Sequence, residues 1–212
     1  MDGTLVDSFE LIAESFNYAL RRFLNGTLST EEALSVPGWT LENQLANYIP
    51  SSAIPHAMDR YYTHFMRRFN SRTRIFPGIR GLLFTLHRRG IKLAVCTGAD
   101  KKTASYTLAR SGLSQFFTTV VTVDDVSKPK PDPEGLRIAM KTIGARSDQT
   151  VYLGDHPNDI KGSWNAGVKS AAAYWGSMHR NELEELKPNF SFNHPSEALA
   201  LSAFQFSQKH LD

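Results

Sequence analysis

From residue 76 onward, short apolar runs alternate with stretches of helical spacing, and this alternation limits the folds open to the chain. Parallel strands need long, usually helical crossovers, so the pattern predicts an α/β fold with a doubly wound, Rossmann-like parallel sheet. The expected strands cover residues 92–96, 119–123, 150–153 and 169–174. The expected helices cover residues 79–89, 102–110 and 159–166, with another beginning at Asp132-Pro133, where Asp132 is the expected N-cap.

Residues 8–75 show helical spacing alone. Ser29-Thr30-Glu31-Glu32 offers a capping box for one of these helices. A later helix carries an aromatic stripe, expected to form core, at Tyr61, Tyr62, Phe65, Met66 and Phe69. The sequence therefore predicts a small helical domain over residues 8–75, inserted into an α/β core made of residues 1–7 and 76–212.

Composition excludes several classes of protein. The net charge is +3 over 212 residues and no run of Lys or Arg exceeds two, which gives no support for nucleic-acid binding. The chain has no apolar run long enough to span a membrane. Its single cysteine, Cys96, lies in an apolar run, so no disulfide forms within the chain and a cytoplasmic location is expected.

Polar clusters follow the expected strands where each strand ends. Thr97-Gly98 follows residues 92–96, Lys128 lies in the loop beyond the second strand, and Gly154-Asp155 follows the third, with Asp159 four residues on. In open α/β sheets, ligands bind at the carboxyl ends of the strands. A further cluster, Asp2-Gly3-Thr4, opens the chain. We expect the four clusters to meet at one site.

These clusters resemble the four motifs of the haloacid dehalogenase (HAD) superfamily, and residues 166–176 look like phosphoglycolate phosphatases in particular. The family's first motif reads Asp-x-Asp-Gly-Thr, follows a central strand, and begins with the nucleophile. Asp2-Gly3-Thr4 matches its last three residues, and Met1 stands in the middle position. The resemblance therefore implies a nucleophilic aspartate one residue before Met1 and a strand before that, both absent from the chain as given. We expect the start to be truncated, because the loss of a central strand would cost much of a domain's stability of about 5–15 kcal/mol.

The resemblance also implies roles for individual residues. Asp2 would act as general acid and base, and its backbone carbonyl would bind the metal. Thr97 and Gly98 would hold the phosphoryl oxygens. Lys128, in Lys128-Pro129-Lys130-Pro131, would neutralise the charge of nucleophile and phosphate, with Lys130 as the rival lysine. Asp155 and Asp159 would bind Mg²⁺, Asp155 directly and Asp159 more plausibly through water.

The expected function is Mg²⁺-dependent hydrolysis of a small phosphorylated metabolite by way of an aspartyl-phosphate. One alternative, if Met1 is the true start, is a protein that binds phosphorylated ligands without turning them over. A sugar phosphomutase is another, because such enzymes share the catalytic core. Two further roles stay open: His156 lies beside the expected metal and Asp7 at a helix start, and either is compatible with an idle surface residue.

Overall fold

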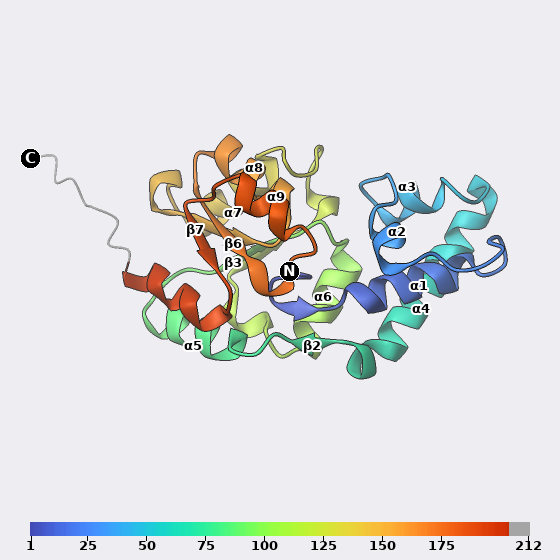
Figure 1. Ribbon diagram of the computed structural model, residues 1–212, viewed down its shortest axis with the longest axis horizontal. Coiled ribbons are helices and arrows are strands. Elements are labelled where there is room, and N and C mark those ends of the chain that lie inside the picture. The colour runs from blue at the N-terminus through green and yellow to red at the C-terminus, as the bar shows by residue number, and fades with distance from the viewer. Residues whose placement is uncertain (204–212) are drawn as a thin grey trace, which may run out of the picture.

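The computed structural model describes residues 1–203 and shows a Rossmann-like α/β core beside a helical segment (Figure 1). The strands after residue 76 pair in parallel: β3 (Ala94–Cys96) with β4 (Thr119–Val121), and β6 (Lys169–Ala173) with both β5 (Val151–Gly154) and β7 (Phe190–Phe192). The fold predicted from the sequence is thus confirmed. The predicted core runs to residue 212, and its last nine residues lie outside the described part of the chain.

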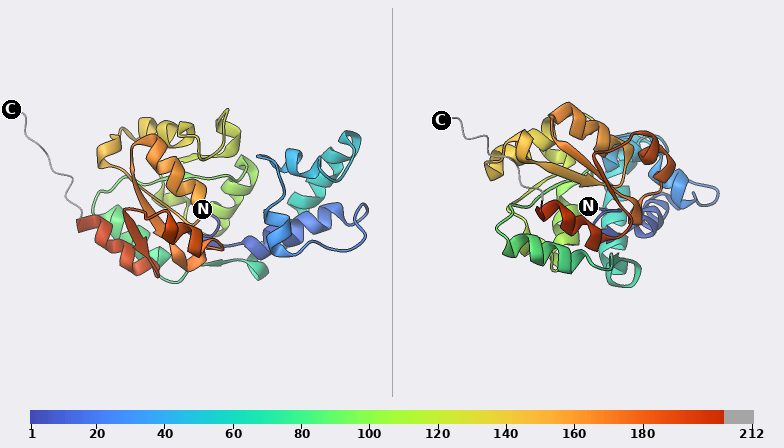
Figure 2. Two further views of the ribbon diagram at one scale, coloured as in Figure 1. Left: turned by 45° about the horizontal axis from the view of Figure 1, so that its top comes forward. Right: turned by 60° about the vertical axis from the view of Figure 1, so that its left-hand side comes forward.

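Helices cover both faces of the strands (Figure 2). One face carries α5 (Ile79–Arg88), α6 (Lys101–Arg110) and the 3₁₀ segment η6 (Pro195–Ala203), whose apolar residues share a cluster with the strands. The other face carries α7 (Glu134–Ile143), α8 (Pro157–Ala166) and α9 (Arg180–Glu185). Shorter 3₁₀ turns are η2 (Ser114–Phe116), η3 (Val123–Asp125), η4 (Ser147–Gln149) and η5 (Tyr174–Gly176).

The parallel strands form two separate ladders, β3–β4 and β5–β6–β7, and within residues 1–203 no backbone pairing joins β3 to β5. A side chain crosses between the ladders instead, where the Tyr152 hydroxyl donates to the Cys96 carbonyl oxygen over 2.7 Å. Val151, Tyr152 and Leu153 are only partly buried, whereas four of the five β6 residues are fully buried between two partners.

The two linkers of the helical segment pair with each other. β1 (Val6–Asp7) lies antiparallel to β2 (Arg74–Ile75), with Val6 opposite Ile75. The sequence did not predict this pair, since two residues are too few to show a strand period. The ladder holds the start and the end of the segment together.

Between β1 and β2 run α1 (Phe9–Leu20), α2 (Thr30–Leu34), α3 (Leu41–Leu45), η1 (Ser51–Ala53) and α4 (Ile54–Arg72). The predicted capping box is present, since Ser29 Oγ accepts from the Glu32 amide and Glu32 accepts from the Ser29 amide. The segment has its own apolar cluster around Leu11, Phe16 and Phe65, separate from the core cluster.

The start of α7 differs by one residue from the prediction. Asp132 was expected as N-cap, but the helix begins at Glu134 with Pro133 in the cap position. Asp132 Oδ1 instead accepts from the Glu134 amide over 3.0 Å, a local turn that holds the chain out of the helix until Glu134. Among residues 1–203, none of the helices is long and apolar enough to cross a bilayer.

Candidate active site

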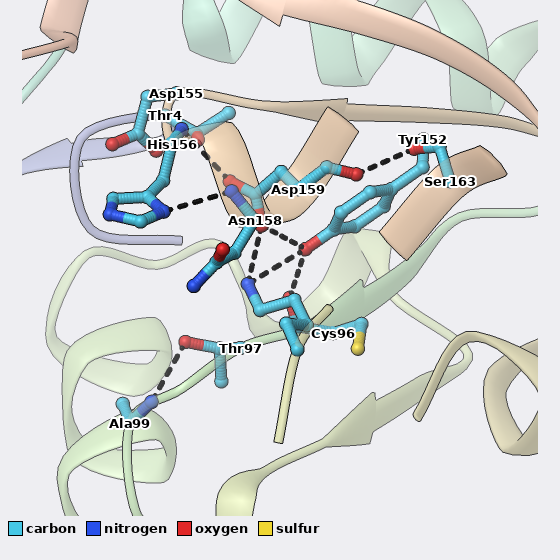
Figure 3. Close-up of polar contacts among 11 residues, drawn as sticks. Thr4, Cys96, Thr97, Ala99, Tyr152, Asp155, His156, Asn158, Asp159 and Ser163 are labelled. Carbon is cyan, nitrogen blue, oxygen red and sulfur yellow. Dashed lines mark hydrogen bonds and ion pairs between the residues drawn. The ribbon is translucent and has the colours of Figure 1, made fainter. Parts of the chain in front are cut away.

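The turn after Asp2 is bound to the end of β5. Thr4 Oγ1 donates to Asp155 Oδ1 over 2.6 Å, and both residues are buried (Figure 3). Gly3 has a φ of +69°, and a Cβ there would lie 2.2 Å from Asp155 Oδ2, so this position requires glycine. The motif residues Asp2-Gly3-Thr4 and Asp155, distant in sequence, therefore meet as expected.

A second layer of contacts holds this turn and Asp155 in place. The Trp175 indole donates to the Thr4 carbonyl over 2.9 Å, and Ser177 Oγ donates to the Asp155 carbonyl over 2.6 Å. Gly176 between them lies so close to Gly3 that a Cβ would come within 2.0 Å of the Gly3 oxygen. The sequence analysis did not assign a role to these contacts, although residues 175–176 contributed to the phosphoglycolate-phosphatase resemblance.

Asp2 lies half-buried at the start of this turn. Its Oδ1 accepts from Ser8 Oγ, the residue before α1, over 2.5 Å. The contact fixes one carboxylate oxygen and leaves the other free of a partner within the described residues. Asp2 is therefore oriented by the segment that leads into the helical insertion.

The two carboxylates of the fourth motif have opposite electrostatic surroundings. Burial and the neighbouring Asp159 carboxylate raise the pKa of Asp155 to about 7, more than the Thr4 hydrogen bond lowers it. Burial is the largest influence on Asp159 and acts to raise its pKa, but the charge and hydrogen bond of Lys130, together with the His156 amide and the chain's amino terminus, make the net shift downward. Asp155 forms no ion pair among residues 1–203, whereas Asp159 is paired with Lys130.

Lys130 is the cation that pairs with Asp159. Its Nζ lies 2.6 Å from Asp159 Oδ1 and donates to the Tyr152 hydroxyl over 3.1 Å. Burial would lower the pKa of Lys130, but the Asp159 carboxylate raises it well above its ordinary value. Tyr152 in turn donates to Cys96, so one network spans the interval between β3 and β5 (Figure 3). No sequence motif marks Tyr152.

Lys128, which the sequence analysis preferred over Lys130, has a more exposed position. Its amide donates to Glu134 Oε2 over 3.1 Å, and its ammonium forms no ion pair within residues 1–203. It lines a small pocket at the end of β3 together with Thr97, Gly98 and Lys130. The structure therefore brings Lys128 near the predicted phosphoryl-binding residues, and Lys130 onto the carboxylate of Asp159.

Thr97 follows β3 and is buried, while Gly98 is exposed. The Thr97 hydroxyl accepts from the Ala99 amide over 3.1 Å, and its own amide donates to Val121 on β4 over 2.9 Å. These contacts hold the loop as a tight turn at the strand end. Its position fits the predicted binding of phosphoryl oxygens.

The residues around Asp155 fit a magnesium ion. Burial and the Asp159 carboxylate raise the pKa of Asp155, so a bound cation would stabilise its charged form, and oxygen is the donor that Mg²⁺ prefers. Within residues 1–203, His, Cys, Asp and Glu form no group of three or more that could hold a metal by themselves. A bound Mg²⁺ would therefore take its other ligands from backbone oxygen, substrate and water, which is its usual habit.

His156 serves the start of α8. Its Nδ1 accepts from the Asn158 amide over 3.0 Å, and its own amide donates to Asp159 Oδ2 over 3.1 Å. The histidine ring also contacts His179 edge to face. The capping contact gives His156 a structural role beside Asp155.

Comparison with known proteins agrees with this geometry. The family described as haloacid dehalogenase-like hydrolase matches residues 1–173. The chain belongs to this family. A pyrophosphatase PpaX of Halalkalibacterium halodurans is 30% identical over 190 residues, covering 90% of this chain and 88% of the relative.

Solved structures show the same HAD fold. A predicted phosphoglycolate phosphatase from Haemophilus somnus aligns with a TM-score of 0.85 at 21% identity, covering 95% of each chain. CbbY from Rhodobacter sphaeroides, solved in complex with phosphate, aligns with a TM-score of 0.80 at 21% identity over 95% of each chain. These two matches support the fold, and the family assignment rests on the family model and the sequence relative above.

Proposed function

We propose that the protein hydrolyses a small phosphate monoester with Mg²⁺ by way of an aspartyl-phosphate. The observation that carries this proposal is the buried Asp155–Asp159 pair, one carboxylate bound to the Asp2 turn and the other to Lys130. The family's nucleophilic aspartate would precede Met1, and its strand would lie in the interval between β3 and β5. Both would then lie beside this carboxylate pair.

Each residue has a part in this proposal. Asp2, oriented by Ser8, gives a proton to the leaving oxygen and then takes one from water. Thr97 and Gly98 bind phosphoryl oxygens at the end of β3. Asp155 and the Asp2 carbonyl would hold Mg²⁺, which when bound offsets the charge of the phosphate dianion. Asp159 contributes indirectly, because its ion pair holds the Lys130 ammonium in place.

The choice between the two lysines is part of the proposal. Lys130 already contacts Asp159, whereas Lys128 lines the pocket near Thr97 with an exposed ammonium. We therefore assign the neutralising charge to Lys130 and leave to Lys128 an accessory contact with the phosphate. If Lys128→Met lowers kcat/KM more than Lys130→Met does in active, folded protein, the assignment is reversed.

The substrate class and the setting are also proposed. The PpaX relative is named a pyrophosphatase, and a small phosphorylated metabolite is consistent with that name. Residues 8–75 would act as a cap over the site, because they join the core through β1 and β2 directly after the Asp2 turn. The buried, unpaired thiol of Cys96 is consistent with a cytoplasmic location.

The test is to extend the chain at its N-terminus by an apolar strand ending in Asp directly before Met1. We expect Mg²⁺-dependent hydrolysis of phosphate monoesters by the extended protein and little by the 212-residue chain. The matched control carries the same extension ending in Asn, which keeps the strand and removes the nucleophile. Equal activity of the Asp and Asn forms would overturn the aspartyl-phosphate.

The two alternatives predict different results in the same test. A protein that only binds phosphorylated ligands would stay inactive with the Asp extension. A phosphomutase would convert a sugar phosphate to its isomer without releasing phosphate. Measuring both phosphate release and isomer formation separates these outcomes.

A further inference from the structure

A cleft of about 840 Å³ lies between the helical segment and the core. Its core wall is α6 and the loops before it and after β4, and its other wall is α3 and α4. In Figure 1, α6 is the core helix that faces the helical segment. Asp100 lines the cleft and follows Thr97 by three residues in the chain, so the loop that carries the predicted phosphoryl-binding turn leads into the cleft wall.

Helix α4 presents a second apolar stripe to this cleft. Ile54, Ala57, Tyr61, Phe65 and Phe69 are buried inside the helical segment, as expected for core. Another stripe, Met58, Tyr62 and Met66, follows at intervals of four residues, is partly exposed, and lines the cleft. The sequence analysis assigned Tyr62 and Met66 to the core; Tyr62 does pack partly against the core cluster of the helical segment, and both residues also line the cleft.

The charged groups of the cleft are of mixed sign and sum to −1: Lys101 and Lys102 against Glu42, Asp100 and Asp124. Lys102 Nζ lies 4.0 Å from the centre of the Tyr62 ring, which binds it to the wall. Burial, and then the carboxylates of Asp100 and Asp124, raise the pKa of Tyr62, so these two acidic groups lie close enough to act on the cleft wall. A second anionic group on the ligand gains little from such a lining.

Resting on the proposed function, we propose that this cleft binds the leaving group of the phosphate ester, and that this group is an uncharged, ring-sized moiety with apolar surface. The Met58–Tyr62–Met66 stripe supplies the apolar contact. The volume falls within the range of about 300–1,000 Å³ typical of sites for organic ligands. Pyrophosphate and phosphoglycolate are small and carry two anionic groups each, so they would leave the stripe uncovered.

The test reads the cleft directly, without catalysis. The chain contains five methionines, which ¹³C-methyl labelling resolves by NMR: Met1, Met58, Met66, Met140 and Met178. We expect phenyl phosphate to shift the methyl signals of Met58 and Met66 and to leave that of buried Met140 in place. Pyrophosphate, phosphoglycolate and inorganic phosphate should leave the Met58 and Met66 signals unchanged.

A pair of matched variants tests the contact. Met58→Ala should weaken the binding of phenyl phosphate roughly fivefold and leave the binding of inorganic phosphate unchanged. The methyl signal of Met66 reports binding in this variant. Met178→Ala, which removes an exposed methionine outside the cleft, should change neither. If Met58→Ala fails to fold, Met66→Ala with Met58 as reporter gives the same comparison.

The outcomes separate this inference from the proposed function. If the extended protein hydrolyses phenyl phosphate but the Met58 and Met66 signals stay still, the cleft inference is wrong and the phosphatase stands. Equal shifts with pyrophosphate would also overturn it. If the signals shift but no monoester is hydrolysed, the cleft binds organic phosphates and the proposed reaction fails.

Discussion

The ion pair between Lys130 and Asp159 should be the most costly single polar contact to break in this protein. The two side chains are 21% and 6% exposed, and their charged atoms lie 2.6 Å apart. Removing one partner of a buried pair costs about 3–5 kcal/mol, because the other charge stays buried without compensation. Since Lys130 is one-fifth exposed, we expect Lys130→Met to cost about 3 kcal/mol, at the lower end of that range.

The sign of the pH dependence follows from the Asp159 carboxylate. In the native protein its pKa lies below the ordinary value, so its contribution to stability is present at neutral pH and is lost as the pH falls through that lowered pKa. Without Lys130, burial raises the pKa of Asp159 instead. The deficit of Lys130→Met should therefore grow as the pH rises from 5 to 8.

Urea denaturation at both pH values measures this deficit, with Lys128→Met as the matched control. Lys128 has an exposed ammonium without an ion pair among residues 1–203, so its loss should change the free energy of unfolding by less than about 0.5 kcal/mol. A double variant, Lys130→Met with Asp159→Asn, should recover part of the loss by removing the stranded charge. Equal costs for the two lysine variants, or a Lys130→Met deficit that shrinks with rising pH, would refute the reasoning.

Three further results are expected. In the Asp-extended protein, Asp155→Asn should raise the Mg²⁺ concentration needed for half-maximal activity far more than Asp159→Asn does. Asp159→Asn acts through Lys130 and should lower activity by about 10–100-fold. Equal losses in the two variants would mean that both carboxylates bind the ion directly. In metal-free buffer, the contribution of Asp155 to the free energy of unfolding should fall as the pH rises from about 4 through about 7, because its pKa is raised to about 7. Asp155→Asn should flatten this pH dependence in urea titrations. An unchanged slope in the variant would contradict the raised pKa. Gly3→Ala should lower the free energy of unfolding by roughly 3 kcal/mol or more in the same assay, since the new Cβ would clash with Asp155. Gly90→Ala is the matched control, because Gly90 has a similar φ of +72° but nothing within 4 Å, and it should cost only about 1 kcal/mol. Similar costs for the two variants would exclude the clash.

The sequence alone determined the features that arise from local patterns. The alternation of apolar runs and helical stretches predicted β3 to β6 and the helices between them, because side-chain period and crossover length follow from backbone geometry. Ser29 and Glu32 form their capping box from contacts three residues apart. The positions of Thr97 and Asp155 at strand ends also followed, since parallel strands bring their carboxyl ends to one edge.

Only the tertiary structure decided between residues that local sequence makes equivalent. Lys128 and Lys130 both precede a proline in the same loop, and only packing against Asp159 and Tyr152 shows which ammonium is buried in an ion pair. In the same way, Tyr62 belongs to an aromatic stripe on α4 and packs partly against the core of the helical segment, but only the position of α6 shows that it also lines a cleft. Burial and ion pairing depend on which distant segments meet, and helical or strand periodicity within one segment carries no information about that.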